Sequence, residues 1–241
     1  MASVFKPNDQ PTLALFDLDK TLIPLDSDHA WGEFMIRSGW VDEIAYRAAN
    51  NQFYQDYQQA CLDPRAYLQF CLAPLTTAPM QLWQQRRDEY IKQTILPLFK
   101  SHLLDGVLAV VKRHRDHGDT LIMITATNAF VARPIARMFG FDDLIAVEPC
   151  FSEAAYTGEF EGEPTFGVGK CVAFDRWWAK KQVYENLPDV SVAAQSAWFY
   201  SDSINDLPLL SRVGNPVIVN GDEALRAHGL KHDWLELDWF A

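Results

Sequence analysis

Short apolar runs recur along much of the chain, separated by stretches in which apolar residues return every three or four positions. The runs at residues 13–16, 120–125, 144–147, 197–200, 217–219 and 234–237 have the length of buried strands. The intervening stretches at residues 105–114, 130–139, 174–187 and 206–211 have helical periodicity. Strands that alternate with helices predict an α/β fold, with a doubly wound, mainly parallel sheet.

Residues 28–98 interrupt this alternation. They contain no convincing strand, and helical patterns occupy residues 30–37, 41–59, 64–72 and 80–94, with breaks at Gly39, at Asp63-Pro64 and at residues 74–79. We therefore expect a helical bundle at residues 26–99, inserted into a core formed by residues 1–25 and 100–241. Residues 148–169, rich in glycine and acidic side chains, predict a hairpin or flap.

The composition narrows the classes of partner. A chain of 241 residues that is 49% hydrophobic can bury a full core. Its net charge of −11 argues against binding to nucleic acid or to an anionic membrane surface, so small molecules are the expected partners. No run approaches the roughly 20 apolar residues of a membrane-spanning helix, and residues 1–11 lack a leader pattern. We expect a cytoplasmic protein, and its oligomeric state stays open.

The four cysteines do not indicate a metal or a disulfide framework. They are scattered at Cys61, Cys71, Cys150 and Cys171, with no Cys-x-x-Cys pair. Reduced thiols are the expectation.

Two aspartates follow the first apolar run, in the sequence Asp17-Leu-Asp19-Lys-Thr21. Carboxylates at the end of a strand in an open α/β sheet are well placed for chemistry, and Asp17 is a candidate nucleophile. The alternative is a loop aspartate that caps the next helix, which this motif alone does not exclude.

Three further polar sites follow predicted strands or begin predicted helices. Thr125 ends one run and either holds a phosphate oxygen or caps a helix. Lys170 either neutralises a phosphoryl group or is a solvated lysine. Asp202, Asn205 and Asp206 follow another run, and their clustered carboxylates favour a hard divalent cation.

In this order and on these elements, the four sites resemble the motifs of the haloacid dehalogenase superfamily of phosphotransferases. The resemblance covers nearly the whole chain and implies a Rossmann-like core. A helical cap after the first motif is similar to the phosphoserine-phosphatase-like subgroup. The sequences Asp26-Ser-Asp-His-Ala-Trp31, Ile124-Thr-Ala-Thr-Asn128 and Tyr200-Ser-Asp-Ser-Ile-Asn-Asp-Leu-Pro-Leu-Leu210 resemble a bacterial branch that includes histidinol-phosphate phosphatases.

The resemblance implies a mechanism for phosphomonoester hydrolysis. Asp17 would form an aspartyl-phosphate and Asp19 would act as general acid and base. Mg²⁺ would be bound by Asp17, the main-chain carbonyl of Asp19 and Asp202. Thr125 and Lys170 would hold the phosphoryl oxygens, supported by Asn205 and Asp206. Thr21 is expected to stabilise the loop.

The resemblance also indicates where the substrate is recognised. Asp26 corresponds to the acidic residue that meets the amine of phosphoserine, whereas Gln69 stands where the subgroup has a carboxylate-binding arginine. Histidinol phosphate has an amine and an imidazole but no carboxylate, which suits this pattern. Arg65, one helical turn from Gln69, is a possible substitute for the arginine. Asp26, Asp28 and His29 are the candidate substrate contacts, with helix capping as the alternative for Asp28 and His29.

Histidinol phosphate is therefore the expected substrate. The alternatives are phosphoserine or another small amino-alcohol phosphate, and a non-catalytic protein that binds a phosphorylated ligand. His114 and His117 lie one helical turn apart, but the charged residues around them predict a solvated helix face and not a metal site. The eight tryptophans are expected to pack in cores, beside the cap groove or in a subunit contact.

Overall fold

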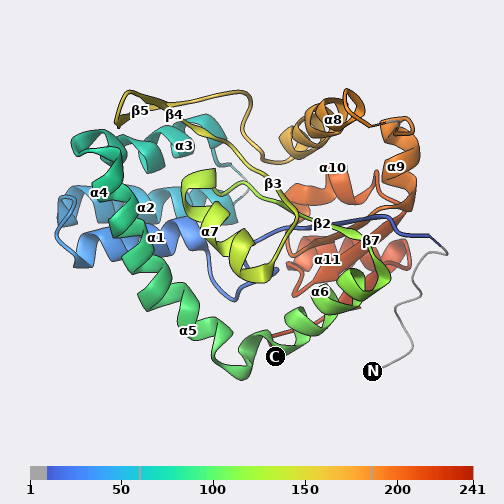
Figure 1. The fold of residues 1–241 in the computed structure, drawn as a ribbon. Helices are drawn as coiled ribbons and strands as arrows, with labels where there is room; N and C mark the ends of the chain where they lie inside the picture. Colours follow the sequence, from blue (N-terminus) through green and yellow to red (C-terminus); the bar gives the residue numbers. More distant parts are fainter. Residues whose placement is uncertain (1–9, 60, 186, 241) are drawn as a thin grey trace.

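A six-stranded parallel sheet forms the core of the computed structural model, which describes residues 10–59, 61–185 and 187–240 (Figure 1). Its strand order is β3-β2-β1-β6-β7-β8. The strands are β1 (Leu13–Phe16), β2 (Thr120–Ile124), β3 (Asp143–Ile145), β6 (Trp198–Ser201), β7 (Asn215–Val219) and β8 (Leu235–Leu237). All six predicted strands are present, which confirms the doubly wound α/β class.

Successive side chains of each strand point to opposite faces of the sheet, and each face has its own hydrophobic core. Phe16 belongs to the core shared with α6 (Asp105–His117) and α7 (Ala129–Phe139). Leu15 belongs to the core on the other face. That face is covered by α8 (Val168–Gln182), α9 (Val190–Ser196), α10 (Leu207–Leu210) and α11 (Glu223–Lys231). The predicted helix at residues 174–187 ends at Gln182 in the structure, and its expected extension includes residue 186, outside the described residues.

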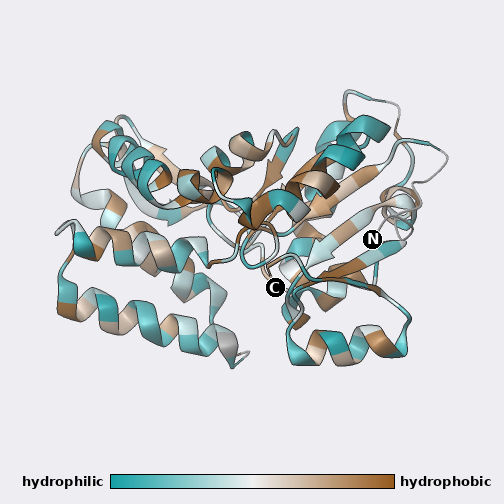
Figure 2. Ribbon diagram, turned by 90° about the horizontal axis from the view of Figure 1, so that it is seen from below, coloured by the Kyte–Doolittle hydropathy of each residue, from teal (hydrophilic) through white to brown (hydrophobic). Residues whose placement is uncertain are grey.

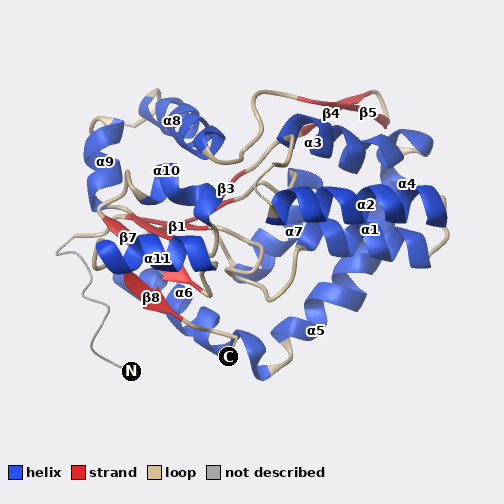
Figure 3. Ribbon diagram, turned by 180° about the vertical axis from the view of Figure 1, so that it is seen from behind, coloured by secondary structure: helices blue, strands red, loops and turns tan. Residues whose placement is uncertain are grey.

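The helical insertion between β1 and β2 lies to one side of the sheet (Figures 1 and 3). It contains α1 (Ser27–Arg37), α2 (Glu43–Gln58), α3 (Pro64–Leu72), α4 (Met80–Tyr90) and α5 (Leu96–Phe99), with a 3₁₀ helix η1 (Ala73–Thr77) and a π-helical turn η2 (Ile91–Ile95). Aspartate side chains at Asp26, Asp42 and Asp63 accept the first N–H groups of α1, α2 and α3, which fixes where these helices begin. The helices alternate hydrophilic and hydrophobic stretches, as helices packed on one side do (Figure 2).

Tryptophans fill the interior of this insertion. Trp31 and Trp83 are fully buried, and Trp31 packs at 6.0 Å from Trp40 and 6.3 Å from Trp83 between ring centroids. The expectation that tryptophans pack in cores is confirmed at these positions.

An antiparallel hairpin, β4 (Pro149–Ser152) and β5 (Ala155–Phe160), leaves the core and contacts the helical insertion. The Met80 N–H at the start of α4 donates to the Ala154 carbonyl at 2.8 Å. The hairpin predicted within residues 148–169 is therefore confirmed, and it joins the segment after β3 to the inserted helices.

The expectation about a leader concerns mainly residues 1–9, which lie outside the described residues. In the described part, no single helix is long and apolar enough to cross a membrane, and Met80–Phe99 with His102–His117 meets that test only as a pair bent by 69°.

Candidate active site

The candidate site lies where the carboxyl ends of three neighbouring strands meet. Asp17 follows β1, Thr125 follows β2 and Asp202 follows β6, and these strands are adjacent in the order β2-β1-β6. The Asp17 N–H donates to the Tyr200 carbonyl at 3.0 Å, which continues the β1–β6 ladder up to the first aspartate. Parallel pairing thus brings together side chains that are far apart in the sequence.

Lys170 joins two of the acidic residues. Its Nζ lies 2.6 Å from Oδ1 of Asp17 and 2.6 Å from Oδ2 of Asp206. Lys170 is in the first turn of α8 and only 2% exposed, so the alternative of a solvated lysine is wrong. Ser201, which sequence reasoning did not single out, donates its hydroxyl to the same Asp206 oxygen at 2.6 Å.

Asp17 and Asp202 face each other across Thr21. The Thr21 hydroxyl lies 3.5 Å from Oδ2 of Asp17 and 3.4 Å from Oδ1 of Asp202. Burial raises the pKa of Asp17 to about 6, although the attraction of Lys170 opposes this shift. Burial also raises the pKa of Asp202 well above its usual range, and the negative charges of Asp17 and Asp206 add to the effect. Lys170 contacts Asp17 and Asp206 but not Asp202, so the three neighbouring carboxylates favour an additional cation.

The donor set at this point fits Mg²⁺. In the part of the chain that the structure describes, no three His, Cys, Asp or Glu side chains converge as a closed metal cage. Mg²⁺ does not require such a cage, because it keeps several waters and commonly takes only one or two protein carboxylates. Asp17 and Asp202, with the main-chain oxygen of Asp19, meet that requirement.

Asp19 is fixed by two donors from different parts of the chain. The Ser27 N–H donates to Oδ1 at 2.8 Å and the Thr127 hydroxyl donates to Oδ2 at 2.7 Å. Burial raises the pKa of Asp19 to about 7, with a further contribution from the charge of Asp26. A carboxyl group with this pKa exchanges a proton readily near neutral pH.

The residue between Asp19 and Thr21 connects the core to the inserted helices. Lys20 has a left-handed backbone with φ of 57°, and its carbonyl accepts a hydrogen bond from the Asn220 side chain at 3.0 Å. Its Nζ lies 5.1 Å from the ring centroid of Tyr54 and 5.4 Å from that of Tyr57, both on α2. The loop that carries both aspartates thus contacts the insertion directly.

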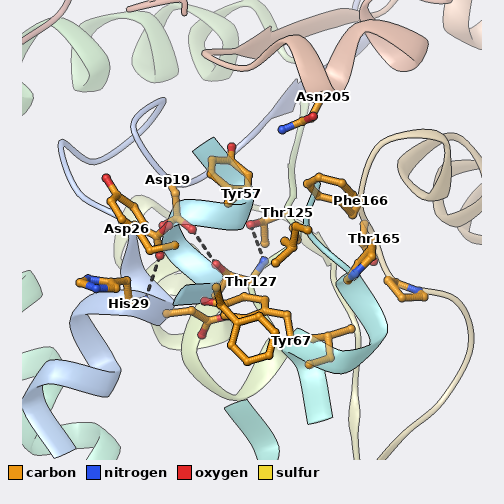
Figure 4. A pocket seen from close by; sticks show the side chains of 18 of the residues that line it. Asp19, Asp26, His29, Tyr57, Tyr67, Thr125, Thr127, Thr165, Phe166 and Asn205 are labelled. Atoms are coloured by element: carbon orange, nitrogen blue, oxygen red, sulfur yellow. Dashed lines mark hydrogen bonds between the residues drawn. The ribbon is translucent and has the colours of Figure 1, made fainter. Parts of the chain in front are cut away.

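A cavity beside these residues has walls from the core and from the insertion (Figure 4). Of the residues predicted from sequence, it is lined by Asp17, Asp19, Asp26, Asp28, His29, Thr125, Lys170, Asn205 and Asp206. Aromatic side chains form much of the remaining wall, namely Phe53, Tyr54, Tyr57, Tyr67 and Phe166. Asp202 does not line the cavity, and its Oδ1 lies 3.4 Å from the Thr21 hydroxyl. The sequence did not assign this aromatic wall, because its members come from two helices and the loop before α8.

The three candidate substrate contacts have different surroundings. Asp26 is the N-cap of α1, and its Oδ1 accepts from the His29 N–H at 2.9 Å. His29 is half-buried, with Nε2 3.2 Å from Oδ1 of Asn51. Asp28 is buried, and its Oδ1 accepts from Nδ2 of Asn128 at 3.0 Å. The capping alternative is therefore wrong for Asp28 and His29, since Asp26 caps the helix.

No arginine lines the cavity among the residues that the structure describes. Gln69 is exposed and is not part of the cavity wall. Arg65 forms an exposed ion pair with Glu163 at 3.3 Å, and its guanidinium lies 5.1 Å from the Phe160 ring. Arg65 thus stands outside the cavity and does not replace the missing arginine.

His114 is buried, whereas the sequence predicted that it would be exposed to solvent. It is fully buried, with Nδ1 2.7 Å from Oδ2 of Asp119 and Nε2 2.7 Å from the Tyr200 hydroxyl. The prediction of a solvated helix face is wrong here because His114 lies on the inner face of α6, in line with Val107 and Val111.

The comparisons with known proteins agree with this fold and site. The family model for haloacid dehalogenase-like hydrolases matches residues 14–211. The chain belongs to this family, and it is a phosphatase that hydrolyses phosphoric monoesters.

Its relatives include enzymes with stated substrates. A histidinol-phosphatase of Neisseria meningitidis is 37% identical over 228 residues, which cover 94% of this chain and 98% of that protein. A phosphoserine phosphatase of Mycobacterium tuberculosis is 27% identical over 95% of this chain and 71% of its own length. A crystal structure of a Bordetella pertussis protein of unknown function has a TM-score of 0.84 and 35% identity, covering 96% of this chain and all of that one. The structure of a phosphoserine phosphatase with a phospho-aspartyl intermediate analogue has a TM-score of 0.61 at 15% identity. The match covers 93% of this chain and 99% of that one, and it shows that the two proteins share a fold.

Proposed function

We propose that the protein is a Mg²⁺-dependent phosphatase that acts through an aspartyl-phosphate on Asp17 and hydrolyses histidinol phosphate. The observation that carries the choice of substrate is the wall of the cavity, which is acidic and aromatic and contains no arginine among the described residues. Such a wall suits a flat, positively charged leaving group. Lys20 also lines this wall, but among the described residues the wall has no guanidinium for the two parallel hydrogen bonds that clamp a carboxylate.

Asp17 is the nucleophile in this proposal. An oxygen of Asp17 attacks phosphorus, the bond from phosphorus to the ester oxygen breaks, and the phosphoryl group is carried on the carboxylate until water hydrolyses it. Lys170 and Thr125 hold the phosphoryl oxygens as their charge redistributes. Asp17, Asp202 and the Asp19 carbonyl would hold Mg²⁺, and the bound ion would reduce the repulsion between the carboxylate and the phosphate dianion.

Asp19 moves the proton. In its protonated form it donates to the departing alkoxide, and the resulting carboxylate later removes a proton from the attacking water. Its pKa of about 7 allows both protonation states near neutral pH. Ser27 and Thr127 hold its oxygens in position, which makes them positioning residues.

The leaving group occupies the cavity beyond the phosphate. Asp26 faces its amine and the aromatic side chains of α2 and α3 cover its ring. The histidinol-phosphatase of Neisseria meningitidis, at 37% identity, supports this substrate. Phosphoserine or another small amino-alcohol phosphate is the second candidate, favoured by the Mycobacterium tuberculosis relative. The non-catalytic alternative is not retained, because the family is one of hydrolases and every ionisable residue of the mechanism is present.

The proposal also covers the domain organisation, the partner and the cellular role of the protein. Residues 26–99 would act as a cap domain over a catalytic core of residues 1–25 and 100–241, with a small phosphomonoester as the partner. A cytoplasmic location and a role in histidine biosynthesis follow from the proposed substrate.

A panel of phosphomonoesters tests the proposal. With Mg²⁺ present, kcat/KM is measured for histidinol phosphate, phosphoserine, phosphoethanolamine and sugar phosphates. We expect histidinol phosphate to exceed each of the others by at least about tenfold, the factor that one charge-assisted hydrogen bond of about 1.4 kcal/mol supplies. A higher value for phosphoserine would overturn the substrate, and full activity in excess chelator would overturn the metal.

A further inference from the structure

Asp28 has an acceptor oxygen that the protein leaves without a partner. The side chain is in the first turn of α1, is 3% exposed and belongs to the wall of the cavity. Its Oδ1 is bonded to Nδ2 of Asn128, but its Oδ2 is buried with no hydrogen-bond donor among the described residues. Oδ1 of Asn128, which is 1% exposed, is also unpartnered in the described part of the chain. A buried polar atom without a partner lowers stability, so its retention calls for a physical reason.

The architecture of the helix does not supply that reason. Asp26 already caps α1, so Asp28 is not needed to start the helix. Burial raises the pKa of Asp28 well above its usual range, and the charges of Asp19 and Asp26 raise it further. The carboxylate at this position is therefore stabilised by Asn128 alone unless a further donor arrives from outside.

The surroundings indicate what kind of donor fits. Asp28 shares the cavity with the aromatic side chains Tyr67 and Phe53, which suit the face of a planar ring. The nearby acidic residues favour a group that carries positive charge. The carboxylate is a separate acceptor from Asp26, so the start of α1 contributes two acidic positions to the cavity.

We propose that Oδ2 of Asp28 accepts a hydrogen bond from the ring N–H of an imidazole-type leaving group, while Asp26 takes the amine of the same molecule. The inference rests on the proposed function and assigns Asp28 as the residue that distinguishes the ring. Asn128 positions Asp28 through the bond to Oδ1. A leaving group that lacks the ring N–H leaves Oδ2 unpartnered, and the site discriminates against it for that reason.

The appropriate readout is the ratio of kcat/KM values for two substrates. If Asp28 had a purely structural role, its replacement would lower kcat/KM for all substrates by the same factor. Asp28→Asn keeps the shape of the side chain and removes its charge. Asp42→Asn removes the same charge from the N-cap of α2, where asparagine caps equally well, and serves as the matched control. For each protein, kcat/KM is measured with L-histidinol phosphate and with p-nitrophenyl phosphate, which has no N–H group.

The ratio of the two kcat/KM values should fall by at least about tenfold in Asp28→Asn and stay unchanged in Asp42→Asn, since a hydrogen bond to a charged group supplies that factor. Asn128→Ser, which removes the positioning bond, should shift the same ratio in the same direction. An unchanged ratio in Asp28→Asn, or equal losses with both esters, overturns the inference. Thermal unfolding of each variant verifies that it is folded before the ratio is interpreted.

A second measurement separates this inference from the choice of substrate. If the wild-type protein hydrolyses p-nitrophenyl phosphate but not histidinol phosphate, the proposed substrate fails, and L-histidinol is then used as an inhibitor of aryl phosphate hydrolysis. An inhibition constant that rises at least about tenfold in Asp28→Asn, with no change for ethanolamine, supports the role of Asp28. An inhibition constant for L-histidinol that does not change overturns it.

Discussion

Nζ of Lys170 lies 2.6 Å from Oδ1 of Asp17, so the proposed nucleophile is paired with the residue that would hold the phosphate. The same ammonium contacts Asp206 at 2.6 Å, and both of its partners are buried. Lys170 therefore has a structural role in addition to its proposed chemical one, because it is the cation that keeps these two buried carboxylates close together.

Replacement of Lys170 should lower stability as well as activity. In Lys170→Met the carboxylates of Asp17 and Asp206 lose their buried cation, and removal of one partner of a buried ion pair costs about 3 kcal/mol or more. The free energy of unfolding from urea titration measures the loss. Lys180→Met, an exposed position on the same helix, is the control and should change stability by less than about 0.5 kcal/mol. A stable Lys170→Met protein would show that the pair contributes little to the fold.

Replacement of Asp17 by asparagine should abolish the covalent intermediate without unfolding the protein. Burial raises the pKa of Asp17, so the uncharged amide is at least as well tolerated at this position. Acid quenching after mixing with a ³²P-labelled ester should trap label on the wild-type protein, released by hydroxylamine as expected for an acyl phosphate. Asp17→Asn should carry no label and keep a melting temperature no lower than that of the wild type. Label on Asp17→Asn would disprove the assignment of the nucleophile.

Mg²⁺ should stabilise the fold in the absence of substrate. A cation that binds the folded protein alone adds about 2.7 kcal/mol at a concentration of 100 times its Kd, because binding draws the equilibrium toward the folded state. Thermal unfolding with increasing Mg²⁺ should show a rising Tm that chelator reverses, and Asp202→Asn should remove most of the rise. The same rise in the variant would mean that the ion binds elsewhere.

The buried His114 should make stability depend on pH. Burial lowers the pKa of His114 below its ordinary value of 6.5, although Asp119 opposes this shift. The neutral imidazole is therefore favoured in the folded state, and its contribution to stability is lost as the pH falls below about 6.5. The pKa of Asp119 is lowered by its hydrogen bonds to His114, Thr12 and His117, so its own contribution is lost at still lower pH.

The difference in unfolding free energy between wild type and His114→Gln isolates this effect from the other titrating groups. We expect the advantage of the wild type to shrink between pH 7 and pH 5. His102→Gln, at a fully exposed side chain, is the control and should change stability by less than about 0.5 kcal/mol. A difference for His114→Gln that stays constant between pH 7 and pH 5 would contradict the buried-histidine explanation.

Arginine at position 69 should not convert the enzyme to a phosphoserine phosphatase. Gln69 is exposed outside the cavity, so a guanidinium at that position does not reach the substrate. The kcat/KM for phosphoserine should change by less than about threefold in Gln69→Arg and in Arg65→Ala, as expected of exposed positions whose effects stay near 0.5 kcal/mol. A tenfold gain in Gln69→Arg would show that the cap moves this helix over the substrate.

The sheet was predictable because buried parallel strands are apolar on both faces and therefore appear as short continuous runs. The strands that carry Asp17, Thr125 and Asp202 were found in this way. Helices α9 and α11 were missed because they bury few apolar side chains, Ala193 and Ala194 in one case and Leu225 in the other. Their patterns are too sparse to show helical periodicity.

The ionisable residues of the site could be predicted, whereas the hydrogen-bond donors that support them could not. The backbone N–H of Ser27 and the hydroxyl of Thr127 reach Asp19 from segments that only the folded chain brings together. His114 was misjudged from its charged neighbours Lys112, Arg113 and Arg115. Its spacing from Val107 and Val111 is the signal that would have placed it on the buried face.

The position of β1 between β2 and β6 has a consequence for synthesis. Leu13–Phe16 pairs with Thr120–Met123 on one side, and Ala14–Phe16 pairs with Trp198–Tyr200 on the other. A nascent chain therefore cannot complete the central strand until most of the protein has left the ribosome, whereas the inserted helices depend on nearby partners and can form earlier. The proposed nucleophile Asp17 is therefore in place only on a nearly finished chain, and truncated products should lack phosphatase activity.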